Sequence, residues 1–222
     1  MKLTYPPQEI DVEKRNDGTL ILSSPIKLEQ PEINIHSKFK KTCDEFPNNI
    51  WLAEKLDNSW REINYKTAYE YINSISQYLV NIKLNQNKGI MILSGNSLDH
   101  GLLNVAGLCC GVPVSPISVA YSLMSSDYAK LKHCFELVSP GLIYVEDGLM
   151  FEKALENLPI DNITVVCSRN PSTKYKMILF KDLLSTSVEI NLNEIYSAVK
   201  PDYVAKYLFT SGSTGMPKGV IN

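Results

Sequence analysis

The chain has 222 residues, of which 44% are hydrophobic and 21% charged, and its formal net charge is −2. This is the composition of an ordinary soluble globular protein that is long enough to bury its own core. The near-neutral balance excludes the basic face that nucleic-acid binding requires, so we expect no nucleic-acid partner. An anionic ligand must then bind at a local site.

The sequence shows no targeting segment and no candidate membrane span. Residues 1–17 carry two prolines and several charges but no apolar core, which excludes a signal peptide. The longest apolar stretch, 102–120, is broken by glycine and proline and cannot cross a bilayer as one helix. Five cysteines without a C-x-x-C pair fit a reducing cytoplasm, and we expect Cys109 and Cys110, in the apolar stretch, to lie in the core.

The N-terminal part divides into an extension and the start of the main domain. Residues 1–30 are predicted to form an N-terminal extension, irregular apart from a turn at 16–18 and a short strand at 20–22. The main domain, 31–222, opens with a helix predicted over 33–46. The sequence therefore predicts one large domain behind a short leading segment.

Two strands and an amphipathic helix come next. Residues 50–54 and 62–65 read as strands around a turn at 57–59. A helix is predicted over 66–83, because its apolar side chains recur at steps of three and four. These side chains are Ala68, Ile72, Ile75, Leu79 and Ile82. We expect this helix to lie on a sheet.

The central part of the chain has strand–helix–strand order. Residues 90–93 are a short apolar strand, and Asn96 with Asp99 three residues later is the pattern of a helix N-cap. Gly111 is expected to end that helix before a strand at 112–114. Such a unit pairs its strands in parallel through a right-handed crossover.

The same order is repeated downstream. Ser125 is predicted to cap a helix, residues 149–158 form a shorter one, and strands are expected at 142–145 and 163–167. The apolar stripe of the first helix consists of Tyr128, Leu131, Phe135 and Val138. The alternation predicts an α/β fold with a mainly parallel sheet flanked by helices.

A glycine-rich polar motif follows a strand expected at 203–209. Residues 210–218 contain two hydroxyl side chains, a glycine, two more hydroxyls, a second glycine and Lys218. Backbone N–H groups in such a turn can converge on a phosphate. The Walker A spacing is excluded, because Pro217 stands where its second glycine belongs and Gly219 follows the lysine. Apolar residues after the motif indicate that the loop joins two strands.

Residues 210–220 resemble the phosphate-loop signature of the adenylate-forming superfamily, which includes acyl-CoA synthetases, luciferases and the adenylation domains of peptide synthetases. Segments 92–97, 111–116 and 120–123 are similar to the feruloyl-CoA synthetase branch. The resemblance implies the N-terminal part of the large domain of an ATP-dependent acid–CoA ligase. Such an enzyme forms an acyl-adenylate and then a CoA thioester, here on a ferulate-like aromatic acid.

The resemblance also implies a set of site residues. The ATP phosphates would be held by Thr210, Ser211, Gly212, Ser213, Thr214, Gly215 and Lys218. Lys218 is the candidate catalytic residue, which would orient the loop and neutralise charge on the leaving pyrophosphate. The implied partners are ATP with Mg²⁺, a small carboxylic acid and coenzyme A as co-substrate. Thr210 or Thr214 would lie near the metal, and no metal ligand is assigned.

The chain departs from the family by stopping at Asn222, shortly after the loop. In the family the acyl pocket, the nucleoside site and a distal catalytic lysine all follow this point. We therefore expect a truncated portion that binds ATP weakly at best, with its last strand short of sheet partners. A non-catalytic binding module of the same fold and a fatty-acid–CoA ligase fragment remain open alternatives, as do the thiol acceptor and the oligomeric state.

The histidines and two tyrosines are assigned to packing. His36, His100 and His133 fall in predicted helices without a carboxylate and a nucleophile at a recognisable spacing. Tyr128 belongs to the apolar stripe of the helix predicted from Ser125, and Tyr121 lies in segment 120–123, which is similar to the feruloyl-CoA synthetase branch. We interpret all five as structural residues.

Overall fold

A computed structural model describes residues 9–27, 34–56, 58–210 and 215–222 and divides the chain into two compact units, 1–32 and 33–222. The first unit contains an antiparallel hairpin of β1 (Asp11–Lys14) and β2 (Leu20–Ser23). Its turn uses Gly18 at φ +86°, a backbone conformation that favours glycine. The expected turn and strand are confirmed, and β1 is an additional strand.

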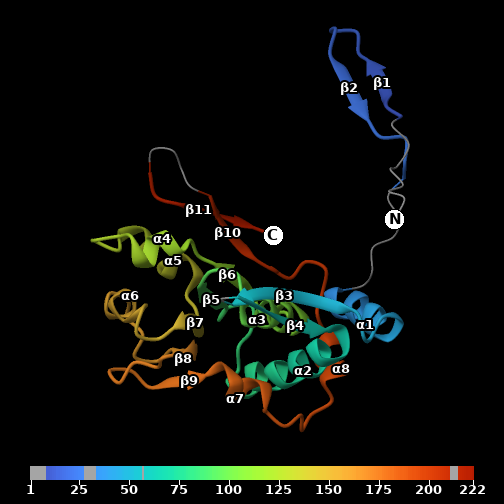
Figure 1. The fold of residues 1–222 in the computed structure, drawn as a ribbon. Coiled ribbons are helices and arrows are strands. Elements are labelled where there is room, and N and C mark those ends of the chain that lie inside the picture. The colour runs from blue at the N-terminus through green and yellow to red at the C-terminus, as the bar shows by residue number, and fades with distance from the viewer. Residues whose placement is uncertain (1–8, 28–33, 57, 211–214) are drawn as a thin grey trace. The chain divides into compact units, whose positions relative to one another are not determined.

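The second unit is built on a five-stranded parallel sheet (Figure 1). Its strands, in spatial order, are β6 (Val114–Pro116), β5 (Ile90–Leu93), β7 (Leu142–Asp147), β8 (Thr164–Arg169) and β9 (Met177–Leu179). All four neighbouring pairs are parallel. The predicted α/β fold with a mainly parallel sheet flanked by helices is confirmed.

Helices connect these strands in the manner of parallel crossovers. They are α3 (Leu98–Cys109) between β5 and β6, α4 (Val119–Leu123) and α5 (Ala129–Val138) between β6 and β7, and α6 (Glu152–Glu156) between β7 and β8. Helix α7 (Phe180–Leu184) follows β9, the last strand of this sheet along the chain. Because β6 and β7 lie on opposite sides of β5, the chain reverses its direction of winding at β5.

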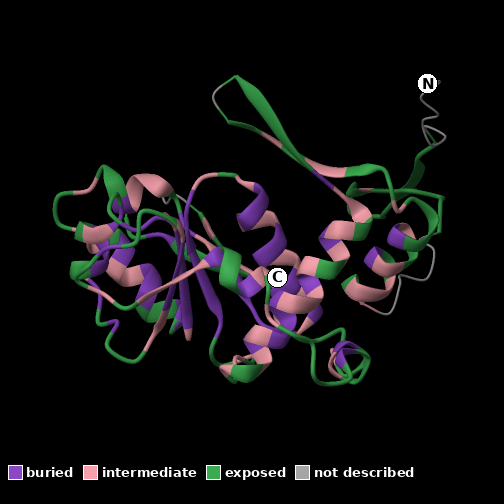
Figure 2. Cartoon of the chain, turned by 60° about the horizontal axis from the view of Figure 1, so that its bottom comes forward, coloured by how far each residue is buried: buried purple, intermediate pink, exposed green. Residues whose placement is uncertain are grey.

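Strand β5 is buried on both faces, as parallel strands covered by helices usually are. Ile90 and Ile92 pack into a core with α3 and α2 (Tyr65–Asn81). Met91 and Leu93, which point the other way, pack into a second core with α5 and α6. Figure 2 shows the sheet strands as the continuous buried layer between helices. The two cores therefore share one sheet.

An antiparallel hairpin and two helices pack on the α2 side. The hairpin is β3 (Ile50–Leu56) with β4 (Ser59–Asn64), and the helices are α1 (Ile35–Glu45) and α8 (Leu192–Ser197). The Trp51 ring of β3 meets the Phe39 ring of α1 edge-on at 5.2 Å between centroids. The predicted strands 50–54 and 62–65 and the helices 33–46 and 66–83 are thus found, with shifted ends.

A second antiparallel hairpin, β10 (Tyr207–Thr210) with β11 (Lys218–Ile221), ends the chain. The chain reaches it along the edge of the sheet, where Val114 N–H donates to Ala205 O at 3.0 Å. Phe209 packs against the second core, whereas Leu208, Val220 and Ile221 are exposed. We call β10–β11 the phosphate hairpin, because it carries the glycine-rich motif.

Two predicted helix starts are wrong. The N-cap of α3 is Ser97 and not Asn96, because the Ser97 side chain accepts the His100 N–H at 3.1 Å. The helix expected from Ser125 begins only at Ala129, because Tyr128 has φ +55° and cannot belong to a right-handed helix. Ser125 instead accepts the Tyr128 N–H in the preceding turn.

Other element limits also differ from the expectation. The helix predicted over 149–158 is confined to α6. The strand predicted over 203–209 begins at Tyr207, because the segment before it turns at 200–203 and follows β6 for one bridge only. Residues 191–199 contain α8, and β9 was not expected from the sequence.

The glycine immediately before β5 gives a test of the packing around this strand. A Cβ on Gly89 would lie 2.8 Å from Pro113 O, the same carbonyl that accepts the Ile90 N–H at 2.8 Å. Gly89→Ala must therefore displace backbone, and we expect a loss of about 1–3 kcal/mol in the free energy of unfolding, measured by urea denaturation. Gly95→Ala is the control, since its Cβ would meet Glu146 Oε2 at an ordinary 3.7 Å. Equal stability of the two variants would contradict the prediction.

Candidate functional site

The phosphate hairpin brings together the two ends of the motif. Thr210 and Lys218 are direct partners across the strands, and Thr210 Oγ1 donates to Lys218 O at 3.4 Å. The loop therefore joins two strands, as predicted, and β11 stands where a Walker loop would begin a helix. Four of the predicted site residues, Ser211, Gly212, Ser213 and Thr214, lie outside the described residues.

The described part of the motif is open to solvent. Gly215 and Lys218 are exposed, and a Cβ built on Gly215 would meet no heavy atom within 4 Å. Gly219 lies across the hairpin from Phe209, and a Cβ built on it would meet that ring at 3.4 Å, an ordinary contact distance. The exposed Lys218 and the open backbone at Gly215 can receive an anion.

One residue of α5 contacts the end of the loop, immediately before β11. His133 Nε2 lies 3.0 Å from Pro217 O, and Pro217 is buried next to the exposed Lys218. His133 is in a helix, as expected, but no local pattern indicates this contact between residues 84 positions apart. The histidine thus belongs to the surroundings of the motif.

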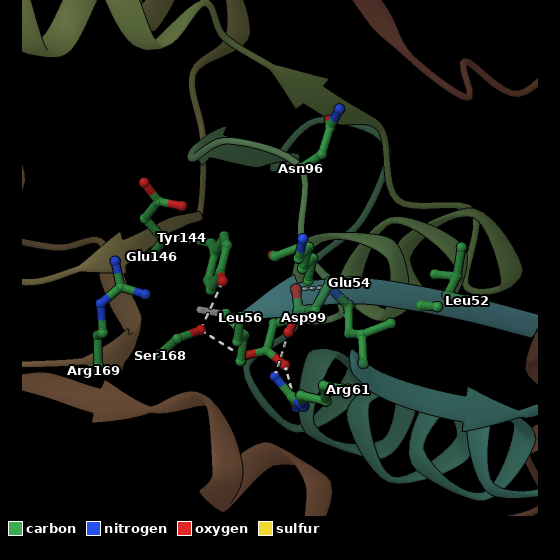
Figure 3. Close-up of a pocket in the computed structure, with 14 residues that line it drawn as sticks. Leu52, Glu54, Leu56, Arg61, Asn96, Asp99, Tyr144, Glu146, Ser168 and Arg169 are labelled. Carbon is green, nitrogen blue, oxygen red and sulfur yellow. Dashed lines mark hydrogen bonds and ion pairs between the residues drawn. The ribbon is translucent and has the colours of Figure 1, made fainter. Parts of the chain in front are cut away.

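A second candidate site lies at the carboxyl ends of the sheet strands. Parallel sheets bind ligands where the winding direction reverses, which here is between β5 and β7. A cavity of about 410 Å³ opens at this place, and we call it the switch-point crevice (Figure 3). The polar and charged residues that line it are Glu54, Lys55, Arg61, Asn96, Ser97, Asp99, Tyr144, Glu146, Ser168 and Arg169.

An ion-pair network connects the β3–β4 hairpin with α3 across the crevice. Arg61 donates to Glu54 Oε1 at 2.9 Å and to Asp99 Oδ1 at 3.0 Å. The other Glu54 oxygen accepts the Leu98 N–H at 2.8 Å, at the N-terminus of α3, where a carboxylate is favourable. Burial of the guanidinium opposes its charging, but attraction to Asp99 and Glu54 outweighs it, so the pKa of Arg61 is raised.

Hydroxyl groups extend the network to β7 and β8. Ser168 Oγ donates to Asp99 Oδ2 at 2.5 Å, and Tyr144 Oη lies 2.7 Å from Ser168 Oγ. Because the single Ser168 proton is directed at Asp99, Tyr144 donates to Ser168. Burial raises the pKa of Tyr144 to about 12, so this phenol stays protonated at neutral pH. These groups satisfy one another and hold the crevice walls together.

The remaining reactive side chains have structural roles. All five cysteines are free, and Cys109 is buried as expected whereas Cys110 is half-buried. Burial raises the pKa of Cys110 to about 11 and that of Cys134 to about 12, so these thiols are unreactive at neutral pH. In the described parts of the chain, no group of three or more His, Cys, Asp or Glu residues is placed to hold a metal ion. No helix among the described residues is long and apolar enough to cross a membrane.

The architecture and the phosphate hairpin together describe an α/β protein with a loop suited to anionic oxygens, and comparison with known proteins identifies its family. Residues 39–222 match the AMP-binding enzyme family. The chain is 26% identical over 222 residues to the long-chain-fatty-acid–CoA ligase ACSBG1 of Homo sapiens, covering 97% of this chain and 30% of that protein. It is 25% identical over 200 residues to the long-chain-fatty-acid–CoA ligase ACSBG2 of Xenopus laevis, covering 86% of this chain and 26% of that protein.

Solved structures share the fold. A luciferase-like enzyme from the mealworm Zophobas morio superposes with a TM-score of 0.66 at 20% identity, over 88% of this chain and 44% of that one. The chain therefore belongs to the AMP-binding enzyme family. It spans less than a third of the length of these two CoA ligases. The feruloyl-CoA synthetase branch is not confirmed by these relatives.

The crevice network gives a test by a double-mutant cycle. Arg61→Gln and Asp99→Asn should each lower the free energy of unfolding. The Arg61 variant should lose roughly 1–2 kcal/mol, less than for a fully buried pair, because the Arg61 side chain is 45% exposed. The double variant should show a coupling energy of about 1 kcal/mol in urea denaturation. Lys55→Gln, which removes another positive charge from the same hairpin, is the control. If the losses in unfolding free energy of the Arg61 and Asp99 variants simply add in the double variant, the two residues are not coupled and the network is refuted.

Proposed function

We propose that this chain is the N-terminal part of an enzyme that activates a carboxylic acid with ATP and transfers the acyl group to the thiol of coenzyme A. Residues 31–222 would form the first part of its AMP-binding domain, and residues 1–30 an N-terminal extension. The observation that carries the proposal is the hydroxyl, glycine and lysine motif set between two paired strands. The match to the AMP-binding enzyme family supports it.

The described ends of the motif fit a polyphosphate. Lys218 offers an exposed ammonium group, and the space beside Gly215 is open. We infer that the β- and γ-phosphates are bound by Thr210, Ser211, Gly212, Ser213, Thr214, Gly215 and Lys218. ATP, bound with Mg²⁺, supplies the adenylyl group and pyrophosphate as the leaving group. Donors fixed around pyrophosphate stabilise the charge that it gains, which is the role proposed for Lys218.

The names of the two CoA ligases favour one class of acid substrate. ACSBG1 and ACSBG2 are named as long-chain-fatty-acid–CoA ligases. We therefore propose a long-chain fatty acid as the substrate, in line with the alternative of a fatty-acid–CoA ligase. The ferulate-like acid stays a prediction. A cytoplasmic location, suggested by the free cysteines, also stays a prediction.

ATP–pyrophosphate exchange by the longest natural polypeptide that contains this chain tests the proposal. Exchange should depend on added palmitate, and Lys218→Ala should lower it by about 100-fold, as expected for the loss of a charged transition-state contact. Lys206→Ala, which changes a lysine just before β10, is the matched control. Exchange with ferulate but not palmitate would replace the fatty acid by the aromatic acid. No exchange with either acid would favour the non-catalytic binding module.

The 222-residue chain alone gives a separate prediction. We expect it to bind Mg·ATP weakly at best and to show no acid-dependent exchange, because the nucleoside and acyl sites of the family lie downstream of the phosphate loop. Isothermal titration with Mg·ATP and the exchange assay on the purified chain measure both properties. Robust exchange by this chain would show that residues 1–222 already contain every group that adenylation needs.

A further inference from the structure

We propose that His133 is a positioning residue that holds Pro217, at the end of the loop next to β11, against α5. Its Nε2 atom lies 3.0 Å from the carbonyl oxygen of Pro217, the residue immediately before Lys218. The attachment itself rests on this geometry, and its role in phosphate binding rests on the proposed function. The sequence had assigned the histidine to packing.

The chemistry of the two groups fixes the direction of the hydrogen bond. A carbonyl only accepts, so Nε2 must carry a proton, either in the neutral Nε2–H tautomer or in the imidazolium. Pro217 has no N–H group, and its carbonyl is therefore its one backbone hydrogen-bonding group. Since Pro217 is buried, loss of the donor would leave this carbonyl in a part-buried place without its partner.

The position of His133 on α5 explains why it can reach the hairpin. Leu131, Cys134 and Phe135 point into the second core and are buried, whereas His133 is half-buried beside this apolar face. Phe209 of β10 packs against the same core. The hairpin is thus attached next to both ends of the loop, through a ring on β10 and through a carbonyl just before β11.

The attachment bears on the geometry of the proposed phosphate site. The peptide group between Pro217 and Lys218 is planar, so holding the Pro217 carbonyl also fixes the direction of the Lys218 N–H. The Lys218 carbonyl is held in turn by Thr210 Oγ1. A loop whose ends are fixed in advance loses less conformational freedom when it binds an anion. His133 should therefore raise the affinity for pyrophosphate without touching it.

Amide hydrogen exchange and pyrophosphate titration, both followed by NMR on the 222-residue chain, test the proposal. In His133→Ala the amides of β11 should exchange at least about fivefold faster, and the dissociation constant for Mg·pyrophosphate should rise by a similar factor. His133→Gln should restore both values, because its side-chain amide can donate near the position of Nε2. The urea midpoint of the sheet should hardly change, which separates positioning from general stability.

A second histidine provides the matched control. His100 Nδ1 lies 3.0 Å from Gly95 O, a bond of the same kind at a distance from the hairpin in sequence and fold. His100→Ala should leave exchange in β11 and pyrophosphate affinity unchanged. If His133→Ala prevents folding, the imidazole ¹⁵N spectrum of the unmodified protein still gives a test, because an Nε2 atom without a proton cannot donate to Pro217 O.

The outcomes distinguish this inference from the proposed function. An Nε2 atom without a proton, or β11 exchange that is equal in His133→Ala and the unmodified chain, would overturn the attachment. If exchange responds to His133→Ala but pyrophosphate leaves the signals of residues 210–218 unchanged, the attachment stands and the proposed phosphate site fails. Faster exchange with unchanged pyrophosphate affinity would overturn the positioning role alone.

Discussion

The burial of β5 on both faces is the constraint on which the rest of the structure depends. Ile90 to Leu93 are fully buried, with alternate side chains in two different cores. A strand in this position must have neighbours on both edges, and the chain supplies them by winding to β6 on one side and to β7 on the other. That reversal opens the switch-point crevice at one end of the sheet and leaves β6 as the edge along which the chain later reaches the phosphate hairpin.

The phosphate hairpin is therefore placed by the sheet without belonging to it. One bridge from β6 brings the chain to β10, and side chains on the α5 side determine where the hairpin lies. Phe209 of β10 packs against the second core. His133 adds one polar contact at the other strand. A motif that must be exposed to receive a ligand can thus be held by a few contacts at its two ends.

Local patterns in the sequence predicted the sheet and the motif, whereas contacts between distant residues could not be predicted. The apolar runs at 90–93 and 142–145 allow only buried parallel strands once helices flank them. Ser97 and Asn96 are both suitable caps, and only the hydrogen bond to the His100 N–H distinguishes them. The left-handed backbone conformation of Tyr128 is not indicated by the residues around it. The pairing of Arg61 with Asp99 and of His133 with Pro217 arises from folding, because the partners are 38 and 84 positions apart.

The two candidate sites differ in what their polar groups already bind, and this difference decides between them. In the crevice, Asp99 is only 7% exposed and is held by Arg61 and Ser168. A ligand that displaced either partner would have to replace a charged hydrogen bond in a mostly buried place, which is costly. At the phosphate hairpin, Lys218 and Gly215 are exposed, so an anion can reach them from solvent. The crevice network is therefore better understood as the contact that fixes the β3–β4 hairpin to α3 and the sheet, and the exposed hairpin as the proposed phosphate site.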